Sequence, residues 1–354
     1  MSFTTLIFGN GLGRAINNDF FALDKGIFKV WNQRGDLEIS HDVKESILSC
    51  LPRVNGKRPK IPVSEEQLQL LHEIRNACRK IRDVEPASVE WLSETFREFP
   101  ESIEEFVAKV SYHFHTYPNL NQEKRHSVFV DGLSKFIKKY RSHIATLNYD
   151  NLLYQPLIDK EILKGWDGHL VDGFYRNKGF SNSHLVRRTH NKDMGWYLHL
   201  HGSPLFCDTD YGIIKKITQY ELPESFEISP LARRHVVLAH SQDKPQIIGE
   251  SPILKTYWRY FSKALAQSTY IYIFGYGGGD NHLNKEIALW AEQRLELNKS
   301  ITIKIVERKT STDIDIRKNY WSKKFSTEEF QVPVTNIKMQ RLSNILDFNW
   351  EREL

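Results

Sequence analysis

The segment FTTLIFGNGLGR, residues 3–14, runs from a strand-forming pattern directly into a loop rich in glycine. Its first half consists of aromatic, β-branched and apolar residues, which predicts a strand over residues 3–8. Gly9, Gly11 and Gly13 follow, and small residues after a strand let backbone N–H groups approach a phosphate. A tight turn from strand to helix is an equally good interpretation of these glycines taken alone. The segment therefore predicts an α/β fold and leaves a nucleotide site open.

The rhythm of strands and helices returns in the second part of the chain. Strands are expected at 143–147, 196–201, 235–239, 270–274, 301–306 and 335–340. Residues 253–267 place apolar side chains on one helical face before the apolar run TYIYIF, which is typical of a parallel sheet. Residues 155–195 and 206–232 are rich in Gly, Asn, Asp and Ser, so we expect long loops there. The expected fold is a Rossmann-like parallel sheet.

Residues 35–141 have a different character, because helical patterns replace the strands. Ser64 and Gln67 form a capping-box signature at the start of one apolar stripe. Further helical segments are expected at residues 88–99 and 102–117. A last helical stripe consists of Phe129, Val130, Leu133, Phe136, Ile137 and Tyr140.

The length of the chain suggests two packed units. With 354 residues it is long for one hydrophobic core, while 40% hydrophobic and 26% charged residues are ordinary for a soluble globular protein. We expect a sheet domain of residues 1–34 and 142–354, interrupted by a helical insertion module at residues 35–141.

The composition indicates a reducing compartment. No apolar run approaches the ~18 residues of a membrane span, and MSFTTLIFGNG lacks the features of a signal peptide. Cys50, Cys78 and Cys207 lie far apart and imply no disulfide framework. The net charge of +5, from 49 basic and 44 acidic residues, is typical of a solvated surface and does not support direct nucleic-acid binding. We expect a cytoplasmic protein that does not associate with membranes.

Polar side chains follow the expected strand at 143–147, in the segment TLNYDN. Asn148 and Asp150 lie two residues apart, so an extended backbone would point both toward the same side. Such side chains can close a turn by bonding their own backbone. They can also line the ligand crevice that lies beyond the carboxyl ends of strands in open α/β sheets.

Two histidines belong to the next motif, WYLHLHGS. At strand spacing Tyr197, His199 and His201 share one face. His201 stands where the strand opens into a loop, and a histidine there can act as a general base near neutral pH. For His199 we favour a place in the core.

A metal site is the alternative interpretation of these histidines. His199 and His201 are followed by Cys207, Asp208 and Asp210, which are residue types that ligate metals. The carboxylates have no fixed spacing, and no third histidine stands nearby in a recognisable motif. We therefore expect no metal, and keep a metal-dependent hydrolase as the least favoured function.

The last motif, IYIFGYGGGDNHL, again joins an apolar strand to glycines. Gly275, Tyr276 and Gly277 open a loop that ends at Asp280, where an N-cap is expected to start a helix. Three consecutive glycines are more than a turn requires and suggest close contact with a ligand. Because four polar or glycine-rich strand ends would meet at one edge of the sheet, we expect a nucleotide crevice there.

The glycine spacing does not support a dehydrogenase. Arg14 breaks the dinucleotide fingerprint, and no second strand–helix unit supplies the acidic residue that would bind the ribose. A nucleotide is plausible, whereas hydride transfer is not.

Taken in order, the motifs resemble those of the sirtuins. The glycine loop with NNDFF resembles Gly-Ala-Gly followed by Pro-Asp-Phe-Arg, TLNYD resembles Thr-Gln-Asn-Ile-Asp, and LHLHGS resembles Leu-His-Gly-Ser. FGYGGGDNHL resembles the late ribose-binding loop. The set is more closely similar to the bacterial sirtuin-like NAD-glycohydrolases of antiphage defence, and it spans nearly the whole sheet domain.

The resemblance implies a role for each matched position. Asn148 would order the attacking water or a ribose hydroxyl, and His201 would be the catalytic histidine. The cofactor-binding positions would be Asp150, Asp19 and Phe20 around the nicotinamide end, Gly9, Asn10 and Gly11 in the phosphate loop, and Gly275, Tyr276, Gly277 and Asp280 on the adenosine-ribose side.

The departures from the sirtuin pattern are informative. The chain has no zinc-binding cysteine quartet, Leu147 replaces the glutamine, and Phe21 replaces the arginine. Deacylation is therefore not expected. Cleavage of the nicotinamide bond needs less, namely a polarised ribose, a base and water.

The function that we expect from the resemblance is an NAD⁺ glycohydrolase that releases nicotinamide and ADP-ribose. It would be the toxic effector of an abortive-infection defence, with NAD as its substrate. A homo-oligomer or a separate hexameric ATPase of the HerA type would control it. The alternative is a module that senses NAD or ADP-ribose without turnover.

Overall fold

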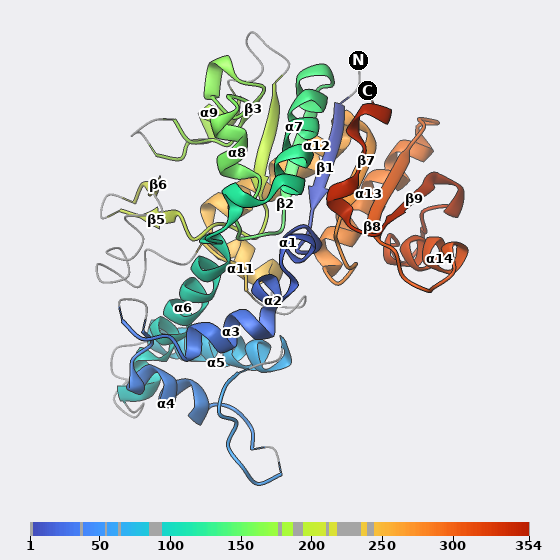
Figure 1. The fold of residues 1–354 in the computed structure, drawn as a ribbon. Coiled ribbons are helices and arrows are strands. Elements are labelled where there is room, and N and C mark those ends of the chain that lie inside the picture. Colours follow the sequence, from blue (N-terminus) through green and yellow to red (C-terminus); the bar gives the residue numbers. More distant parts are fainter. Residues whose placement is uncertain are drawn as a thin grey trace.

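A parallel sheet forms the centre of the protein in the computed structural model (Figure 1). The structure describes residues 3–35, 38–53, 55–62, 65–84, 94–175, 179–186, 194–209, 212–217, 235–238 and 244–353. Its seven strands follow the order β3-β4-β2-β1-β7-β8-β9, and every pairing is parallel. They are β1 (Phe3–Phe8), β2 (Ser142–Thr146), β3 (Leu170–Val171), β4 (Gly195–His199), β7 (Ser268–Phe274), β8 (Thr302–Arg308) and β9 (Ile337–Leu342).

This strand order confirms a Rossmann-like α/β fold. Without the two-residue edge strand β3, the order is that of a doubly wound sheet, in which the chain reverses direction between its first and fourth strands. The reversal lies here between β1 and β7. The crevice of such a sheet lies beyond the carboxyl ends of the strands at that point.

Helices cover both faces of the sheet (Figure 1). Leu6 and Phe8 of β1 point into one core and Ile7 points into the other, because successive strand residues face opposite sides. The first core is closed by α1 (Gly11–Ile16), α7 (Lys124–Lys139) and the short turns η8 (Ile345–Asp347) and η9 (Trp350–Arg352). The second is closed by α12 (Pro252–Gln267), α13 (Asn281–Glu296) and α14 (Ile314–Lys324).

Most of the predicted strands are confirmed, with ends that differ by no more than two residues. The strand predicted at 235–239 is wrong over its described part, residues 235–238. Val236 makes only an isolated bridge with Gly202, and the N–H of Val237 donates to the carbonyl of His201 at 2.9 Å. Residues 236–238 are apolar because they are buried across the tip of β4, and not because they belong to the sheet. Residue 239 lies outside the described residues.

The two predicted long loops contain short elements. They are α8 (Tyr154–Asp159), β3, α9 (Asn182–Val186) and the antiparallel pair β5 (Phe206–Asp208) and β6 (Ile214–Lys216). Elements of two to six residues leave too few positions for a period to be recognised. A further short helix, α11 (Lys244–Glu250), precedes α12.

A group of helices lies beyond the carboxyl ends of the strands in Figure 1. It comprises α2 (Asn18–Phe21), α3 (Leu23–Trp31), α4 (His41–Ser49), α5 (Glu65–Val84) and α6 (Glu94–His115). Ser64, the predicted cap of α5, lies outside the described residues. The break predicted between residues 99 and 102 is wrong, because α6 continues through Pro100. Buried Phe99 and Ile103 carry its apolar face across the proline.

Helix α7 packs on the sheet. The ring of Phe129 meets Phe274 of β7 edge-on at 5.9 Å, and Phe136 contacts Tyr272 at 5.9 Å. One continuous apolar core joins α7 to α3, α4, α5 and α6. The division into a sheet domain and a helical insertion module stays a prediction.

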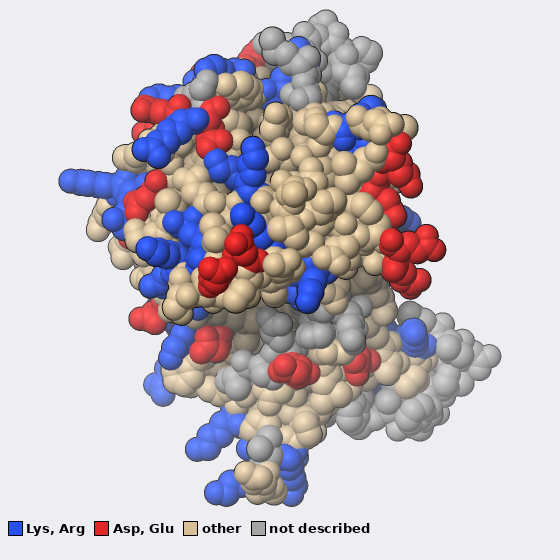
Figure 2. Space-filling view, turned by 90° about the vertical axis from the view of Figure 1, so that its right-hand side faces the viewer, with Lys and Arg blue, Asp and Glu red and all other residues tan. Residues whose placement is uncertain are grey.

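The surface carries charges of both signs. On the face shown in Figure 2, basic and acidic side chains are interspersed around an area of uncharged residues. Among the described helices, none has the length and apolar character needed to cross a membrane.

Candidate active site at the carboxyl ends of the strands

The loops after β1, β2 and β7 meet at one edge of the sheet. Gly9 N donates to the carbonyl of Phe274 at 2.9 Å, and Gly11 N donates to that of Gly275 at 2.8 Å. The side-chain Nδ2 of Asn148 donates to the carbonyl of Gly9 at 3.1 Å. The predicted meeting of these motifs is confirmed, and it lies at the reversal point between β1 and β7.

Three of the glycines are required by this contact between loops. A Cβ atom on Gly11 would lie 2.6 Å from Cα of Gly275, and one on Gly9 would lie 2.9 Å from the Gly275 carbonyl oxygen. Gly275 itself has φ +59°, in the left-handed region that favours glycine. Packing and backbone conformation therefore explain why these three positions are glycine. The role of Gly9, Asn10 and Gly11 as a phosphate loop stays a prediction.

Two further glycines have no such explanation. A Cβ atom on Gly277 or Gly279 would meet no described heavy atom within 4 Å, and neither residue has a positive φ. Their backbone is therefore open to close approach by a ligand, which is one physical reason for glycine at such positions. This is the part of the last motif that best fits a ligand contact.

Asn148 is buried and has an unused hydrogen-bond acceptor. Its side chain is 4% exposed, and its backbone N–H donates to Thr146 Oγ1 at 3.1 Å. With Nδ2 bonded to Gly9, the buried Oδ1 has no partner among the described residues. An unpaired buried acceptor costs about 1–3 kcal/mol, so such atoms usually bond water or a ligand. The amide oxygen is thus available to accept a hydrogen bond from a hydroxyl or a water.

Asp150 both closes a turn and has a perturbed acidity. Its Oδ1 accepts from the N–H of Leu152 at 3.1 Å. This bond closes a turn, which is one of the two interpretations that the sequence allowed. Burial raises the pKa of Asp150 to about 7, although hydrogen bonds from Leu152 and Asn148 act in the opposite direction. The carboxyl therefore titrates near neutral pH, within reach of Asn148.

We expect Asp150→Asn to change how stability depends on pH. The amide keeps an acceptor for Leu152 but does not titrate. Because the folded-state pKa of the carboxyl is about 7 against an ordinary 3.8, the wild-type free energy of unfolding should fall as pH rises between about 4 and 7. As pH rises across that window, the free energy of unfolding of the variant should increase by up to about 4 kcal/mol relative to that of the wild type. Urea unfolding at several pH values measures the difference, and a difference that stays constant would contradict the raised pKa.

His201 is held by a carboxylate. Its Nε2 lies 2.8 Å from Oδ2 of Asp280, and Lys244 Nζ lies 3.0 Å from the same oxygen. Burial, followed by the charge of Lys244, lowers the pKa of His201, against bonds with Asp280 and the Leu147 carbonyl that raise it. Burial alone would raise the pKa of Asp280, but His201 and Lys244 hold it well below its ordinary range. The site thus contains an ionised aspartate that fixes the imidazole.

Asp280 and Tyr276 also shape the start of α13. Oδ1 of Asp280 accepts from the N–H groups of His282 and Leu283, each at 3.1 Å, so the predicted N-cap is confirmed. The Tyr276 hydroxyl accepts from Asp280 N at 2.8 Å and lies 2.9 Å from Asn284 Oδ1. Both residues position the loop, and a contact with an adenosine ribose stays a prediction.

The remaining predicted positions lie on or beside α2. Asn10 Nδ2 donates to the carbonyl of Phe21 at 3.0 Å. The ring of Phe20 stacks on His113 at 4.3 Å, and Asp19 is exposed. Their roles at the phosphate and nicotinamide ends stay predictions.

His199 lies in an aromatic core, as favoured from the sequence. Its ring is 4.9 Å from that of Tyr154 and 5.0 Å from that of Tyr197, and neither ring nitrogen has a partner among the described residues. Burial is the main cause that lowers its pKa to about 3. Because β4 ends at His199, the strand alternation does not extend to His201, which bonds Asp280 instead.

The described donors of the metal alternative do not form one cluster. Asp208 Oδ1 lies 3.0 Å from Nε2 of His235, whereas His199 and His201 have the surroundings described above. Asp210 lies outside the described residues. Within the described ranges, no group of three His, Cys, Asp or Glu side chains is arranged to hold a metal ion.

Lys244 was not identified from the sequence. It is the first residue of α11, in a segment without a recognisable motif, and only the fold brings it to Asp280. No protein-family model matches the chain, and the curated proteins contain no match to it. Function is therefore inferred from the residues and their geometry.

Proposed function

We propose that this protein is an NAD⁺ glycohydrolase built on a sirtuin-type variant of the Rossmann-like fold. The observation that carries the proposal is Asn148 at the reversal point of the sheet, whose Nδ2 is fixed on Gly9 while its buried Oδ1 has no partner in the described part of the chain. The open backbone at Gly277 and Gly279 and the held imidazole of His201 support it.

The reaction needs little covalent chemistry from the protein. The bond between the nicotinamide nitrogen and ribose C1′ breaks through an oxocarbenium-like transition state, and nicotinamide leaves as a neutral molecule. A water adds to C1′ and gives ADP-ribose. Asn148 Oδ1 would accept a hydrogen bond from that water or from a ribose hydroxyl, and His201 would take up the proton. Asp280 would orient the imidazole, as carboxylates do in Asp–His catalytic pairs.

The biological setting follows from the sequence resemblance. An enzyme that empties the NAD pool must stay silent until it is triggered. A homo-oligomer or a HerA-type hexameric ATPase would provide that control in antiphage defence.

The direct test is a nicotinamide-release assay. Purified protein is incubated with NAD⁺, and nicotinamide is followed by chromatography, if necessary with infected-cell extract or the candidate ATPase. We expect release by the wild type and a rate lower by about 100-fold in His201→Ala. His199→Leu, which replaces a buried histidine two residues earlier, should retain the rate. NAD⁺ bound but uncleaved under every condition would contradict the proposal.

A sensing module without turnover is the second candidate. It is favoured by one observation, namely that Asp280 and the Leu147 carbonyl both bond the His201 ring. A substrate must then displace one of them before the ring can accept a proton. In that case His201→Ala would keep the biological activity.

A further inference from the structure

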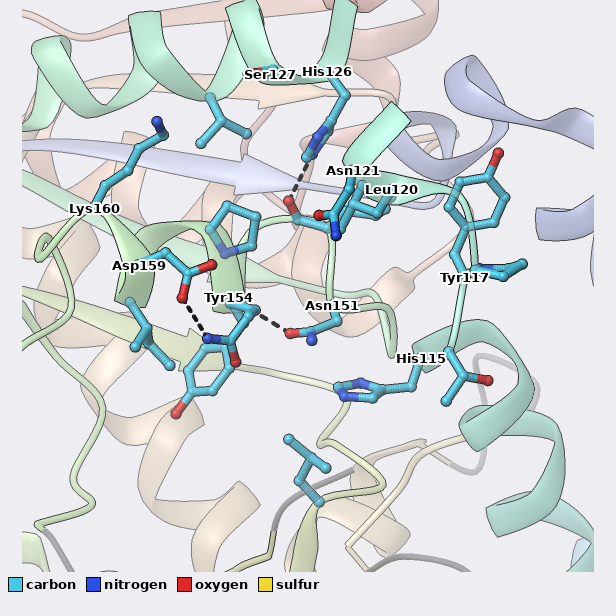
Figure 3. A pocket seen from close by; sticks show the side chains of 18 of the residues that line it. His115, Tyr117, Leu120, Asn121, His126, Ser127, Asn151, Tyr154, Asp159 and Lys160 are labelled. Carbon is cyan, nitrogen blue, oxygen red and sulfur yellow. Dashed lines mark hydrogen bonds between the residues drawn. The ribbon is translucent and has the colours of Figure 1, made fainter. Parts of the chain in front are cut away.

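A cavity of about 960 Å³ lies apart from the crevice residues (Figure 3). Its walls come from the connection between α6 and α7, from the first turns of α7, from α8 and from β6, and Asn148, His201 and Asp280 do not line it. The volume is in the range of about 300–1,000 Å³ that is typical of small-molecule sites. The cavity is therefore a separate candidate site.

His115 presents an unused acceptor to this cavity. The residue is 4% exposed, and its Nδ1 lies 3.0 Å from the carbonyl of Tyr149. A carbonyl can only accept, so Nδ1 carries the proton, and burial lowers the pKa of the ring to about 4. At neutral pH the Nε2 atom is thus unprotonated and carries a lone pair that can accept a hydrogen bond. It is buried without a partner among the described residues. Figure 3 shows the ring pointing toward Asn151 and Tyr154, so an occupant must supply a hydrogen-bond donor.

The two lysines in the described walls are already paired with carboxylates. Lys216 Nζ bonds the Tyr154 hydroxyl and lies 3.2 Å from Asp172 Oδ2. Lys160 Nζ lies 2.5 Å from Asp131 Oδ1, and Asp159 accepts from the Gln155 amide at 2.7 Å. An anionic ligand would find no unpaired cation among these groups, so the walls do not favour a ligand that carries a phosphate.

The other wall residues are aromatic rings and amides. The rings of Tyr117, His126 and Tyr154 surround the space in Figure 3. Asn151 Oδ1 accepts from Gln155 N at 3.1 Å, which leaves the amide NH₂ group to donate. An occupant with a planar ring, hydroxyl groups and both donors and acceptors matches these walls.

We propose that this cavity binds an uncharged nucleoside, with an N–H or O–H of the ligand donating to His115 Nε2. The proposal does not depend on the cleavage of NAD⁺, because it concerns other residues and another space.

The test is calorimetric titration of the full chain with adenosine, guanosine, cytidine and uridine, beside their 5′-monophosphates. At least one nucleoside should bind, and its monophosphate should bind no more tightly. His115→Phe should weaken binding about tenfold or more, because it removes a buried acceptor. Asn121→Trp is a second variant at an exposed wall position, where a large side chain can fill the cavity without disturbing the core. It should abolish binding.

Asn148→Ala provides the control for the NAD crevice and should leave nucleoside binding unchanged. Binding that is lost in Asn148→Ala but retained in Asn121→Trp would place the nucleoside in the crevice and overturn the proposal. A wild type that binds none of the four nucleosides, or binds a monophosphate tenfold more tightly, would overturn it as well.

Discussion

Replacement of Asn148 by alanine is expected to lower the rate of nicotinamide release from NAD⁺ by about 100- to 1,000-fold, the usual effect of removing one preorganised polar group from an active site. The variant loses the buried Oδ1 that is free to bond the reacting water or ribose. The fold should survive, because the side chain gives up only its bonds to the Gly9 carbonyl and to Asp150, each worth about 1 kcal/mol. Initial rates at saturating NAD⁺, measured beside urea unfolding curves, separate the two effects.

The chain offers a matched control for this variant. Asn151 lies three residues later in the same loop, and its Oδ1 accepts from the N–H of Gln155 at the start of α8. Asn151→Ala makes the same chemical change without touching the Gly9 contact, so the release rate should stay near that of the wild type. Equal losses in both variants would show that the loop as a whole matters rather than the Asn148 amide.

The sheet could be predicted because its strands have a local signal. Residues 3–8 and 270–274 are apolar runs followed by glycine, and both are strands at the centre of the sheet. The predictions were wrong where a residue is buried by neighbouring parts of the fold rather than by its own strand or helix period. Residues 236–238 are apolar because they cross the tip of β4, and Pro100 is kept inside α6 by a continuous buried face.

Only the residues that directly follow a strand could be predicted to lie at the site. Asn148 was placed beside the loop after β1, since parallel strands bring their carboxyl ends together. The pair of His201 and Asp280 joins residues 79 positions apart, and a capping aspartate gives no hint of what its second oxygen bonds. No sequence pattern indicates that Lys244 bonds Asp280 or that Nε2 of His115 is buried without a partner among the described residues.

Asp280→Ala is expected to lower the free energy of unfolding by about 3–5 kcal/mol, because it leaves the buried His201 and the partly buried Lys244 without their carboxylate. The loss includes the two N–H bonds at the start of α13, for which about 1 kcal/mol is usual. Urea unfolding at pH 7 measures the change.

The dependence on pH and a matched variant identify the cause. The folded-state pKa of Asp280 is lowered, so its contribution is fully present above the ordinary aspartate value of about 4 and decreases as pH falls below it. The difference in the free energy of unfolding between the wild type and Asp280→Ala should therefore become smaller at acidic pH. Asp313 also caps a helix, α14, through two N–H bonds, but it is exposed and holds no buried ion pair. Asp313→Ala should cost clearly less than Asp280→Ala, whereas equal losses would mean that Asp280 acts as a cap alone.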